Sequence, residues 1–376
     1  MSRSDPRISS FLAERIAAGD FPSAVYLVAE GGRAALADAL GQAVVDPVSI
    51  AATLETIYDL ASLTKPLITG LLCARRIEQR QLALDDAVAT YLPEFDRAGK
   101  RAITIRHLVT HTAGLPAWRP LYLMTGGEPA RALDVIADQP LESAPGTRVT
   151  YSDLGFIALG VILERLADAS IADLAQREIF TPLGLRRTFF NPGLARRQEI
   201  AASEKGNLYE AGMVGDERRP QGPDARAGLI WGEAHDGNAW FLGGAAGHAG
   251  LFSTARETFR LAEQFIAERS QLLGPATCAL FRENMTPGLN EARSLAWQLA
   301  ATRDSTAGPD LPPDSFGHTG FTGTSCWIDA ARARVFILLT NRTHNHPLPF
   351  VNINGVRRRF HTLAVGALNQ AAEQLK

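Results

Sequence analysis

Apolar and polar residues alternate in two different ways along the chain, and each pattern predicts a different kind of element. Near the N-terminus, apolar runs at residues 23–29 and 33–37 flank Gly31 and Gly32, which predicts a β-hairpin. Near the C-terminus, residues 335–340 form an apolar run that is typical of a buried strand. Both ends of the chain are therefore expected to contribute strands.

The middle of the chain has apolar residues at helical spacing instead. Residues 154–166 predict a strongly apolar helix, with Ser152 or Asp153 placed to cap it, and residues 171–179 predict another helix. Further helices are expected over residues 7–18, 103–108, 256–269, 275–283 and 351–372. Residues 186–245 are the least periodic part of the chain, and such a segment is typically functional or poorly ordered.

Two glycine-containing segments lie beside the predicted strands. Residues 41–52 are expected to form a loop that leads towards residues 56–60. Residues 316–329 are expected to form one strand, whose glycines would let a ligand approach the backbone closely.

Together these elements predict an α+β fold. Strands from both chain ends would pair in an antiparallel sheet flanked by helices, with a mostly helical region inserted between them. We expect a single domain over residues 1–376, made of an α/β region at about 1–65 and 246–376 and an inserted region at about 66–245.

Composition narrows the range of partners. The net charge of −2 argues against a nucleic acid or an anionic membrane surface held by bulk electrostatics. Three widely separated cysteines indicate free, mostly buried thiols in a reducing compartment. No apolar leader and no run of roughly 18 apolar residues is present, so we expect no membrane insertion and a cytoplasmic location. An exported protein that had lost its leader would show the same start.

Candidate chemistry first appears at Ser62-Leu63-Thr64-Lys65, where a helix is expected to begin. At 3.6 residues per turn, Ser62 and Lys65 would lie on one face, so the lysine amine could activate the serine hydroxyl. That amine serves as a base only if its pKa is depressed, which burial or the helix dipole would favour. Yet about one Ser-x-x-Lys arises by chance in a chain this long, in which case Ser62 only begins a helix and Lys65 is a solvated charge.

Two further motifs follow in a fixed order and change that picture. They are Tyr151-Ser152-Asp153 and His318-Thr319-Gly320. With all three motifs, the chain resembles the serine β-lactamase and penicillin-binding protein superfamily, whose motifs are Ser-x-x-Lys, Tyr-x-Asn and Lys-Thr-Gly. It is most similar to the class C branch, which also holds esterases and D-amino-acid peptidases. The phrases LVTHTAGLP, GHAGLFST and TGFTGTS extend the resemblance over nearly the whole chain.

The resemblance implies a role for each matching residue. Ser62 would be the acylated nucleophile, Lys65 the base that takes its proton, and Tyr151 a second proton-transfer group. The backbone N–H groups of Ser62 and Phe321 would form the oxyanion hole. The resemblance implies that neither a metal nor a cofactor takes part.

Substrate would lie along the strand that carries Thr319 and Gly320. His248, in a small-residue loop, would either line the site or serve the structure. His111 is expected to be a structural hydrogen-bonding residue, and Arg342 could reach a substrate carboxylate.

Two residues depart from the family motifs. Asp153 replaces asparagine, so it either bonds Lys65 and favours its charged form or only caps the following helix. His318 replaces lysine, and a mostly neutral histidine should bind a substrate carboxylate less well.

We therefore expect a serine hydrolase that acts through an acyl-enzyme on a small ester, amide or peptide. Esterase activity is favoured, then D-peptidase or cell-wall-peptide amidase activity, then β-lactamase activity. The alternative is a degenerate binding or sensor protein that is acylated without turnover. The oligomeric state and the natural substrate do not follow from the sequence.

Overall fold

The structure is a computed structural model that describes residues 3–97, 99–214 and 226–373. Within these residues, the largest sheet has the strand order β3-β2-β1-β10-β9-β8-β7, and all neighbouring strands are antiparallel. The strands are β1 (Ser23–Glu30), β2 (Arg33–Val44), β3 (Ile50–Ala51), β7 (Gln298–Leu299), β8 (Phe316–Thr319), β9 (Ser325–Asp329) and β10 (Arg334–Thr340). The central pair β1 and β10 joins the two ends of the chain, as the sequence predicted.

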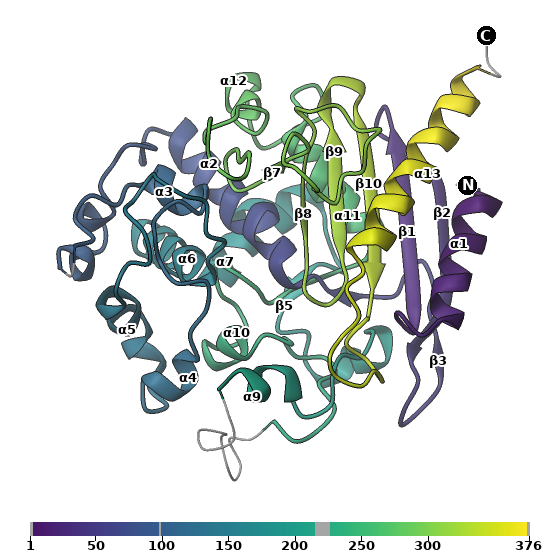
Figure 1. Cartoon of the computed structure of the whole chain (residues 1–376), viewed down its shortest axis with the longest axis horizontal. Coiled ribbons are helices and arrows are strands. Elements are labelled where there is room, and N and C mark those ends of the chain that lie inside the picture. The colour runs from purple at the N-terminus through teal and green to yellow at the C-terminus, as the bar shows by residue number, and fades with distance from the viewer. Residues whose placement is uncertain (1–2, 98, 215–225, 374–376) are drawn as a thin grey trace.

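Helices cover both faces of this sheet (Figure 1). The N-terminal helix α1 (Pro6–Ala17) and the C-terminal helix α13 (Asn354–Glu373) lie side by side on one face, and α11 (Ala255–Ala262) packs on the other. Alternate residues of β10 serve the two faces: Phe336 and Leu338 pack towards α1 and α13, whereas Ile337 packs into the cluster behind the sheet. Burial on both faces explains why these strands read as continuous apolar runs.

The inserted region is mainly helical and stands beside the sheet, at the left of Figure 1. Its centre is α6 (Asp153–Ala167), whose side chains are largely buried and whose first turn is capped by Ser152, which accepts the Gly155 N–H at 3.3 Å. The helices α3 (Ile105–Val109), α5 (Ala132–Asp138) and α7 (Ile171–Ala175) pack against it. The region also contains α2 (Leu71–Glu78), α4 (Leu121–Met124), α8 (Thr181–Leu183), α9 (Leu208–Val214) and α10 (Gly237–Phe241), and α12 (Pro275–Ala279) follows α11 later in the chain. The boundaries of the inserted region, predicted at about residues 66 and 245, stay a prediction.

Several local predictions were wrong. The segment 316–329 forms two strands, because a tight turn with Gly323 at φ 112° reverses the chain between β8 and β9. The expected loop at 41–52 contains the end of β2 and the strand β3. The expected helix at 256–269 ends as an α-helix at Ala262 and continues only as a short 3-10 turn.

A three-stranded sheet that the sequence did not predict brings the catalytic candidates together. Its order is β4 (Tyr58–Asp59), β6 (Leu251–Ser253) and β5 (Phe189–Phe190). Because β4 directly precedes Ser62 and β6 directly follows residues 243–250, this pairing places the loop containing His248 against the Ser62 turn.

Among the described residues, no helix is long and apolar enough to cross a membrane. The same part of the chain holds no group of three or more His, Cys, Asp or Glu side chains placed to bind a metal ion.

Candidate active site

Ser62 and Lys65 contact each other at the bottom of a cleft between the sheet and the inserted region. The Lys65 Nζ donates to the Ser62 Oγ at 2.9 Å, so the spacing of the motif does place both groups on one face. Lys65 is fully buried, whereas Ser62 is half-buried and lines the cleft. Such burial excludes the alternative of a solvated lysine.

The turn that carries Ser62 is not the regular helix start that the sequence predicted. A 3-10 turn (Ala61–Leu63) leads into a π-helical segment (Lys65–Gly70) before α2 begins. Ala61 has a φ of 48°, which is costly for a residue with a Cβ, and the Asp59 carboxylate holds it by accepting its N–H at 2.8 Å. Local strain directly before a nucleophile is typical of a functional turn.

Besides the Ser62 hydroxyl, the Lys65 ammonium contacts two further oxygen atoms. The Asp153 Oδ1 lies 2.6 Å from its Nζ, and the His248 carbonyl oxygen accepts from it at 3.0 Å. Burial alone would lower the pKa of Lys65, but the Asp153 carboxylate and the Tyr151 phenol outweigh it, so this pKa is raised. Lys65 is therefore protonated in the resting protein.

This ion pair decides between the two interpretations of Asp153. Ser152 supplies the cap of α6, and Asp153 is the first residue inside the helix. Its carboxylate also lines the cleft. Asp153 therefore acts on Lys65 and is not the residue whose side chain caps the helix.

Tyr151 stands over the lysine. The Lys65 Nζ is 4.9 Å from the centre of its ring, and the ring of His111 packs on the Tyr151 ring at 4.5 Å. Burial raises the pKa of Tyr151, although Lys65 acts in the opposite direction, so the phenol is neutral in the resting protein. The His111 Nδ1 accepts the Ser152 N–H at 3.0 Å, which agrees with the structural role expected for His111.

The turn between β8 and β9 forms the opposite wall of the cleft and is tied to the Ser62 turn. The Thr322 hydroxyl donates to the Asp59 carbonyl at 2.7 Å, and the Thr324 hydroxyl donates to the Leu60 carbonyl at 3.0 Å. A Cβ at Gly320 would lie 2.4 Å from the same Leu60 oxygen, so only glycine fits there. These contacts hold Phe321 beside Ser62, and both residues line the cleft.

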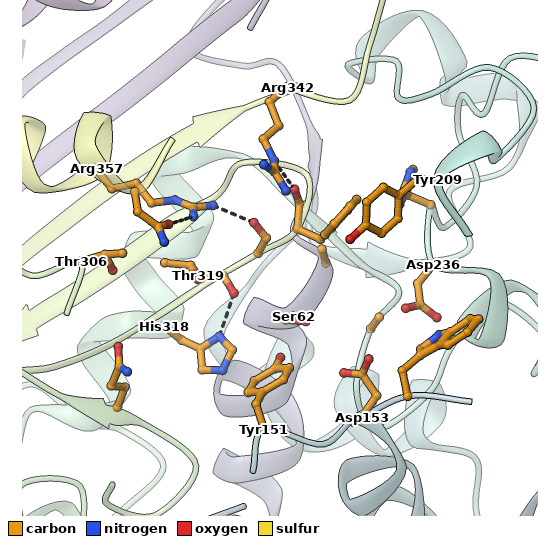
Figure 2. Close-up of a pocket in the computed structure, with 18 of the residues that line it drawn as sticks. Ser62, Tyr151, Asp153, Tyr209, Asp236, Thr306, His318, Thr319, Arg342 and Arg357 are labelled. Carbon is orange, nitrogen blue, oxygen red and sulfur yellow. Dashed lines mark hydrogen bonds between the residues drawn. The ribbon is translucent and has the colours of Figure 1, made fainter. Parts of the chain in front are cut away.

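Thr319 and His318 occupy the end of β8 on this wall, as Figure 2 shows. The His318 Nδ1 donates to the Thr319 carbonyl at 2.9 Å, since that oxygen can only accept. Burial, reinforced by Arg293, lowers the pKa of His318 well below its ordinary value, so the imidazole is neutral. A neutral side chain at this position agrees with the prediction for His318.

His248 does not contact the cleft, and the prediction that it could bind substrate is not supported. Its side chain is fully buried and is absent from the lining of the cleft. Its Nε2 pairs with the Asp236 Oδ1 at 2.8 Å, and its carbonyl holds Lys65. His248 is therefore a positioning residue.

Sequence reasoning missed several charged residues that line the cleft, which has a volume of about 490 Å³. On the side of the sheet these are Arg293 and Arg357, next to Arg342, which the sequence had suggested. On the side of the inserted region they are Glu210 and Asp236. The only signal for the two acids was their place in the aperiodic segment 186–245, where function was expected.

Comparisons with known proteins agree with this geometry. The family model named Beta-lactamase matches residues 8–357. A putative D-alanyl-D-alanine carboxypeptidase of Escherichia coli K12 is 31% identical over 322 residues, which cover 79% of this chain and 71% of that protein. A protein of the same description from Salmonella agona is 30% identical over 367 residues, which cover 90% and 83% of the two chains.

Solved structures share the fold. EstCE1, a hydrolase with promiscuous acyltransferase activity, is 25% identical with a TM-score of 0.73 and covers 94% of this chain and 97% of its own. A class C β-lactamase from Rhodobacter sphaeroides is 19% identical with a TM-score of 0.69 and covers 97% and 100%. The match over most of the chain, with the contact between Ser62 and Lys65 at the centre of the cleft, shows that this chain belongs to the beta-lactamase family of serine hydrolases.

Proposed function

We propose that this hydrolase forms an acyl-enzyme on Ser62 and removes the C-terminal residue of short D-amino-acid peptides. The observation that carries this proposal is a pair of arginines in the cleft wall, Arg342 and Arg357, which form no ion pair with any described residue. The relatives described as putative D-alanyl-D-alanine carboxypeptidases support the stereochemistry.

Both guanidinium groups are held by backbone carbonyl oxygens. Arg357 donates to the carbonyl of Gly320 at 2.8 Å, and Arg342 donates to the carbonyl of Phe321 at 2.6 Å (Figure 2). Arg357 also donates to the carbonyl of Thr324 at 3.1 Å. Among the described residues, neither forms an ion pair, and the Arg357 Nε has no hydrogen-bond partner. Burial and the neighbouring Arg342 lower the pKa of Arg357 to about 9.

Two desolvated cations repel each other, and an anionic ligand bound between Arg342 and Arg357 would offset this repulsion. A peptide carboxylate fits the need, since guanidinium groups bind carboxylates through charge-assisted hydrogen bonds. This cation pair takes over the task for which His318 is unsuited, so a neutral His318 is no obstacle to a peptide substrate. For this reason we place peptidase activity ahead of esterase activity.

Acylation would begin with a proton transfer between Lys65 and Asp153. Moving one proton across their 2.6 Å contact converts the ion pair into a neutral pair and frees the amine as a base. The amine then takes the Ser62 proton as the Oγ attacks the carbonyl carbon. The C–N bond breaks as Lys65 returns this proton through Tyr151 to the leaving amine. The freed Lys65 amine then takes a proton from water, whose oxygen attacks the acyl-Ser62 ester, and the same proton passes to the Ser62 Oγ as the ester bond breaks.

The oxyanion of each tetrahedral intermediate would be held by the N–H groups of Ser62 and Phe321. The bonds that tie the β8–β9 turn to Asp59 and Leu60 fix their separation before substrate arrives. Pre-organised donors of this kind are worth about 3 kcal/mol each in comparable sites.

Ester hydrolysis is the second candidate activity. It is supported by the likeness to EstCE1 and by the neutral His318, which does not itself demand a charged substrate. An activated ester also needs less assistance for its leaving group than an amide does.

Two substrates and one variant test this proposal. N-acetyl-D-alanyl-D-alanine and p-nitrophenyl acetate are given to the wild type and to Ser62→Ala, and release of D-alanine and p-nitrophenol is measured. We expect the wild type to cleave both and Ser62→Ala to lose about 10⁴-fold or more. Cleavage of the ester alone would reduce the proposal to an esterase.

A third result would favour the sensor interpretation. Intact-mass spectrometry of the wild type with a β-lactam and with a fluorophosphonate reports acylation directly. A persistent adduct without turnover of either substrate would identify a protein that is acylated but does not complete the reaction.

A further inference from the structure

The cleft wall formed by the inserted region carries carboxylates and faces the arginine wall across Ser62. Asp153, Asp236 and Glu210 line it. Figure 2 shows Asp153 and Asp236 on one side of Ser62, with His318 and Arg357 on the other side. Asp153 pairs with Lys65 and Asp236 pairs with His248 through one oxygen, whereas Glu210 forms no ion pair among the described residues.

Glu210 is the most unusual of these acids. It lies on α9 and is only 6% exposed. Its Oε1 accepts the Gly237 N–H at 2.8 Å. Among the described residues its Oε2 has no partner at hydrogen-bonding geometry, although the Tyr122 phenol lies beside this carboxyl, and burial together with Glu210 raises the pKa of that phenol. A Cβ at position 237 would lie 2.2 Å from that Oε2, so the glycine makes room for it. A buried carboxylate oxygen without a partner is costly and calls for a ligand.

Asp236 supplies a second unused oxygen beside it. Its Oδ1 accepts from the His248 Nε2 and from the Ala239 N–H, both at 2.8 Å, and no described residue donates to its Oδ2. Burial would raise the pKa of Asp236, but His248 outweighs it and keeps the carboxylate ionised. That negative charge, added to burial, raises the pKa of Glu210 to about 7.

The cations near these two acids are already engaged. Arg226 donates to the carbonyls of Ala234 and His235 and lies 3.7 Å from Glu233, although its Nε has no hydrogen-bond partner among the described residues and its charge acts on Glu210. The His235 Nε2 pairs with Glu204 at 2.9 Å. Lys65 is held by Asp153 and Ser62. Within the described part of the chain, no cation donates to either free oxygen.

We propose that Glu210 and Asp236 form a subsite for a primary ammonium group of the substrate. This inference rests on the proposed function, because the substrate would occupy the same cleft. It adds that the end of the substrate opposite the carboxylate carries a positive charge. An ammonium has three donors and matches two carboxylate oxygens. The substrate class is then zwitterionic, with a carboxylate at the arginines and an amine of a diamino acid or ω-amino acyl group at the acids.

A matched pair of esters tests the subsite. The values of kcat/KM for p-nitrophenyl 6-aminohexanoate and p-nitrophenyl heptanoate, which differ in a terminal ammonium against a methyl group, are measured at pH 8 for wild type, Glu210→Gln and Glu268→Gln. We expect the wild type to favour the amino ester at least tenfold. Glu210→Gln should bring this ratio close to one, while Glu268→Gln, at an exposed position, should keep it.

Each other outcome overturns the inference. A wild-type ratio of one or less means that no ammonium site exists, and a folded Glu210→Gln protein that keeps the ratio removes Glu210 from it. An equal loss on both esters by Glu210→Gln would make Glu210 a proton-transfer group instead.

A binding measurement separates this inference from the proposed function and from any folding defect of the variant. Saturation-transfer NMR compares hexan-1-amine with hexan-1-ol on the Ser62→Ala protein, which needs no turnover. The amine is expected to bind at least tenfold more tightly, and equal binding would overturn the subsite even if both esters are hydrolysed. Failure to hydrolyse either ester, with the amine still preferred, would instead count against the proposed function alone.

Discussion

The two walls of the cleft differ in origin, charge and construction. The sheet wall comes from β8, the turn after it and α13, and its arginines are fixed by backbone carbonyls. The wall of the inserted region comes from α6, α9 and the start of α10, and its acids are fixed by helix N–H groups and by His248. Ser62 lies between the two walls, so each wall can bind one side of a substrate while the nucleophile stays in place.

This difference indicates that the groups that carry out the reaction lie at the centre of the cleft, whereas the charges that select the substrate lie on its two walls. The contacts of Ser62 and Lys65 involve residues tied to both walls, through Asp153 on one side and the Asp59–Thr322 link on the other. The unmatched charges lie farther out, at Arg357 and Glu210, where a substrate can neutralise them. Changes at the centre should therefore affect all substrates, and changes at either wall should affect only substrates with the matching charge.

The largest expected effect is at the centre. Lys65→Met keeps much of the buried volume but removes the base, so kcat/KM should fall by about 10³-fold or more on both the peptide and the ester. Lys205→Met, at an exposed position, serves as the control. Activity within tenfold of wild type for a folded Lys65→Met protein would show that the ammonium is not part of the reaction.

The next effect is on the sheet wall alone. Arg357→Met should raise KM about 30-fold for N-acetyl-D-alanyl-D-alanine, because a charge-assisted hydrogen bond contributes about 2 kcal/mol. The ratio between this peptide and p-nitrophenyl acetate is the readout, since Arg357 also positions Gly320. Arg359→Met, on the exposed face of the same helix, is the control. An unchanged ratio would mean that the carboxylate binds elsewhere.

The arginines also show how far sequence reasoning could go. The hairpin of β1 and β2 and the strand β10 were predicted because apolar runs and a Gly-Gly turn are local signals. Nothing local distinguishes Arg357 from Arg358 and Arg359, which follow it directly. Only the packing of α13 against the sheet buries the first and exposes the last.

The same limit applies to the site. Ser62, Lys65 and Tyr151 could be placed together because the resemblance supplied their spatial relation, and the structure brings them within contact distance. The pairing of β4 with β6 consists of two residues per strand and carries no sequence signal, so the position of His248 behind Lys65 could not be derived. Glu210 and Asp236 meet only through the tertiary contact of α9 with α10.

The third prediction concerns the wall of the inserted region and the stability of the fold. Glu210 has an ordinary pKa of 4.5 and a folded pKa of about 7, so the unfolded chain releases this proton at lower pH than the folded protein does. The folded state therefore loses stability as the pH rises from 5 to 8, by about 2 kcal/mol. Tyr122, Asp236, His235 and Arg226 face the same carboxyl and are unchanged in the test.

Urea unfolding of the wild type and of Glu210→Gln at pH 5 and pH 8 measures this effect. The variant should be less sensitive to pH than the wild type by that amount, whereas Glu268→Gln should behave like the wild type. A wild type and a Glu210→Gln variant with parallel pH dependence would show that Glu210 is already neutralised by a partner in the folded protein.

The smallest expected effect separates the charge of Asp153 from its shape. Asp153→Asn removes the negative charge 2.6 Å from Lys65, so the raised pKa of Lys65 should fall. The amine then becomes available at lower pH, and the acidic limb of the kcat/KM profile should move to lower pH. Asp168→Asn, at the exposed left-handed end of the same helix, is the control.

The pH at which the acidic limb lies identifies the titrating base, whereas the plateau value of kcat/KM does not. Asp153→Asn also removes the acceptor that frees the amine, so the plateau of kcat/KM can fall even as the limb moves down. A limb that moves up, or stays in place, would mean that the titrating base is not Lys65 and that proton removal from Ser62 belongs to Tyr151. In that case the ion pair between Lys65 and Asp153 would serve only to keep a positive charge beside the Tyr151 ring, 4.9 Å from its centre.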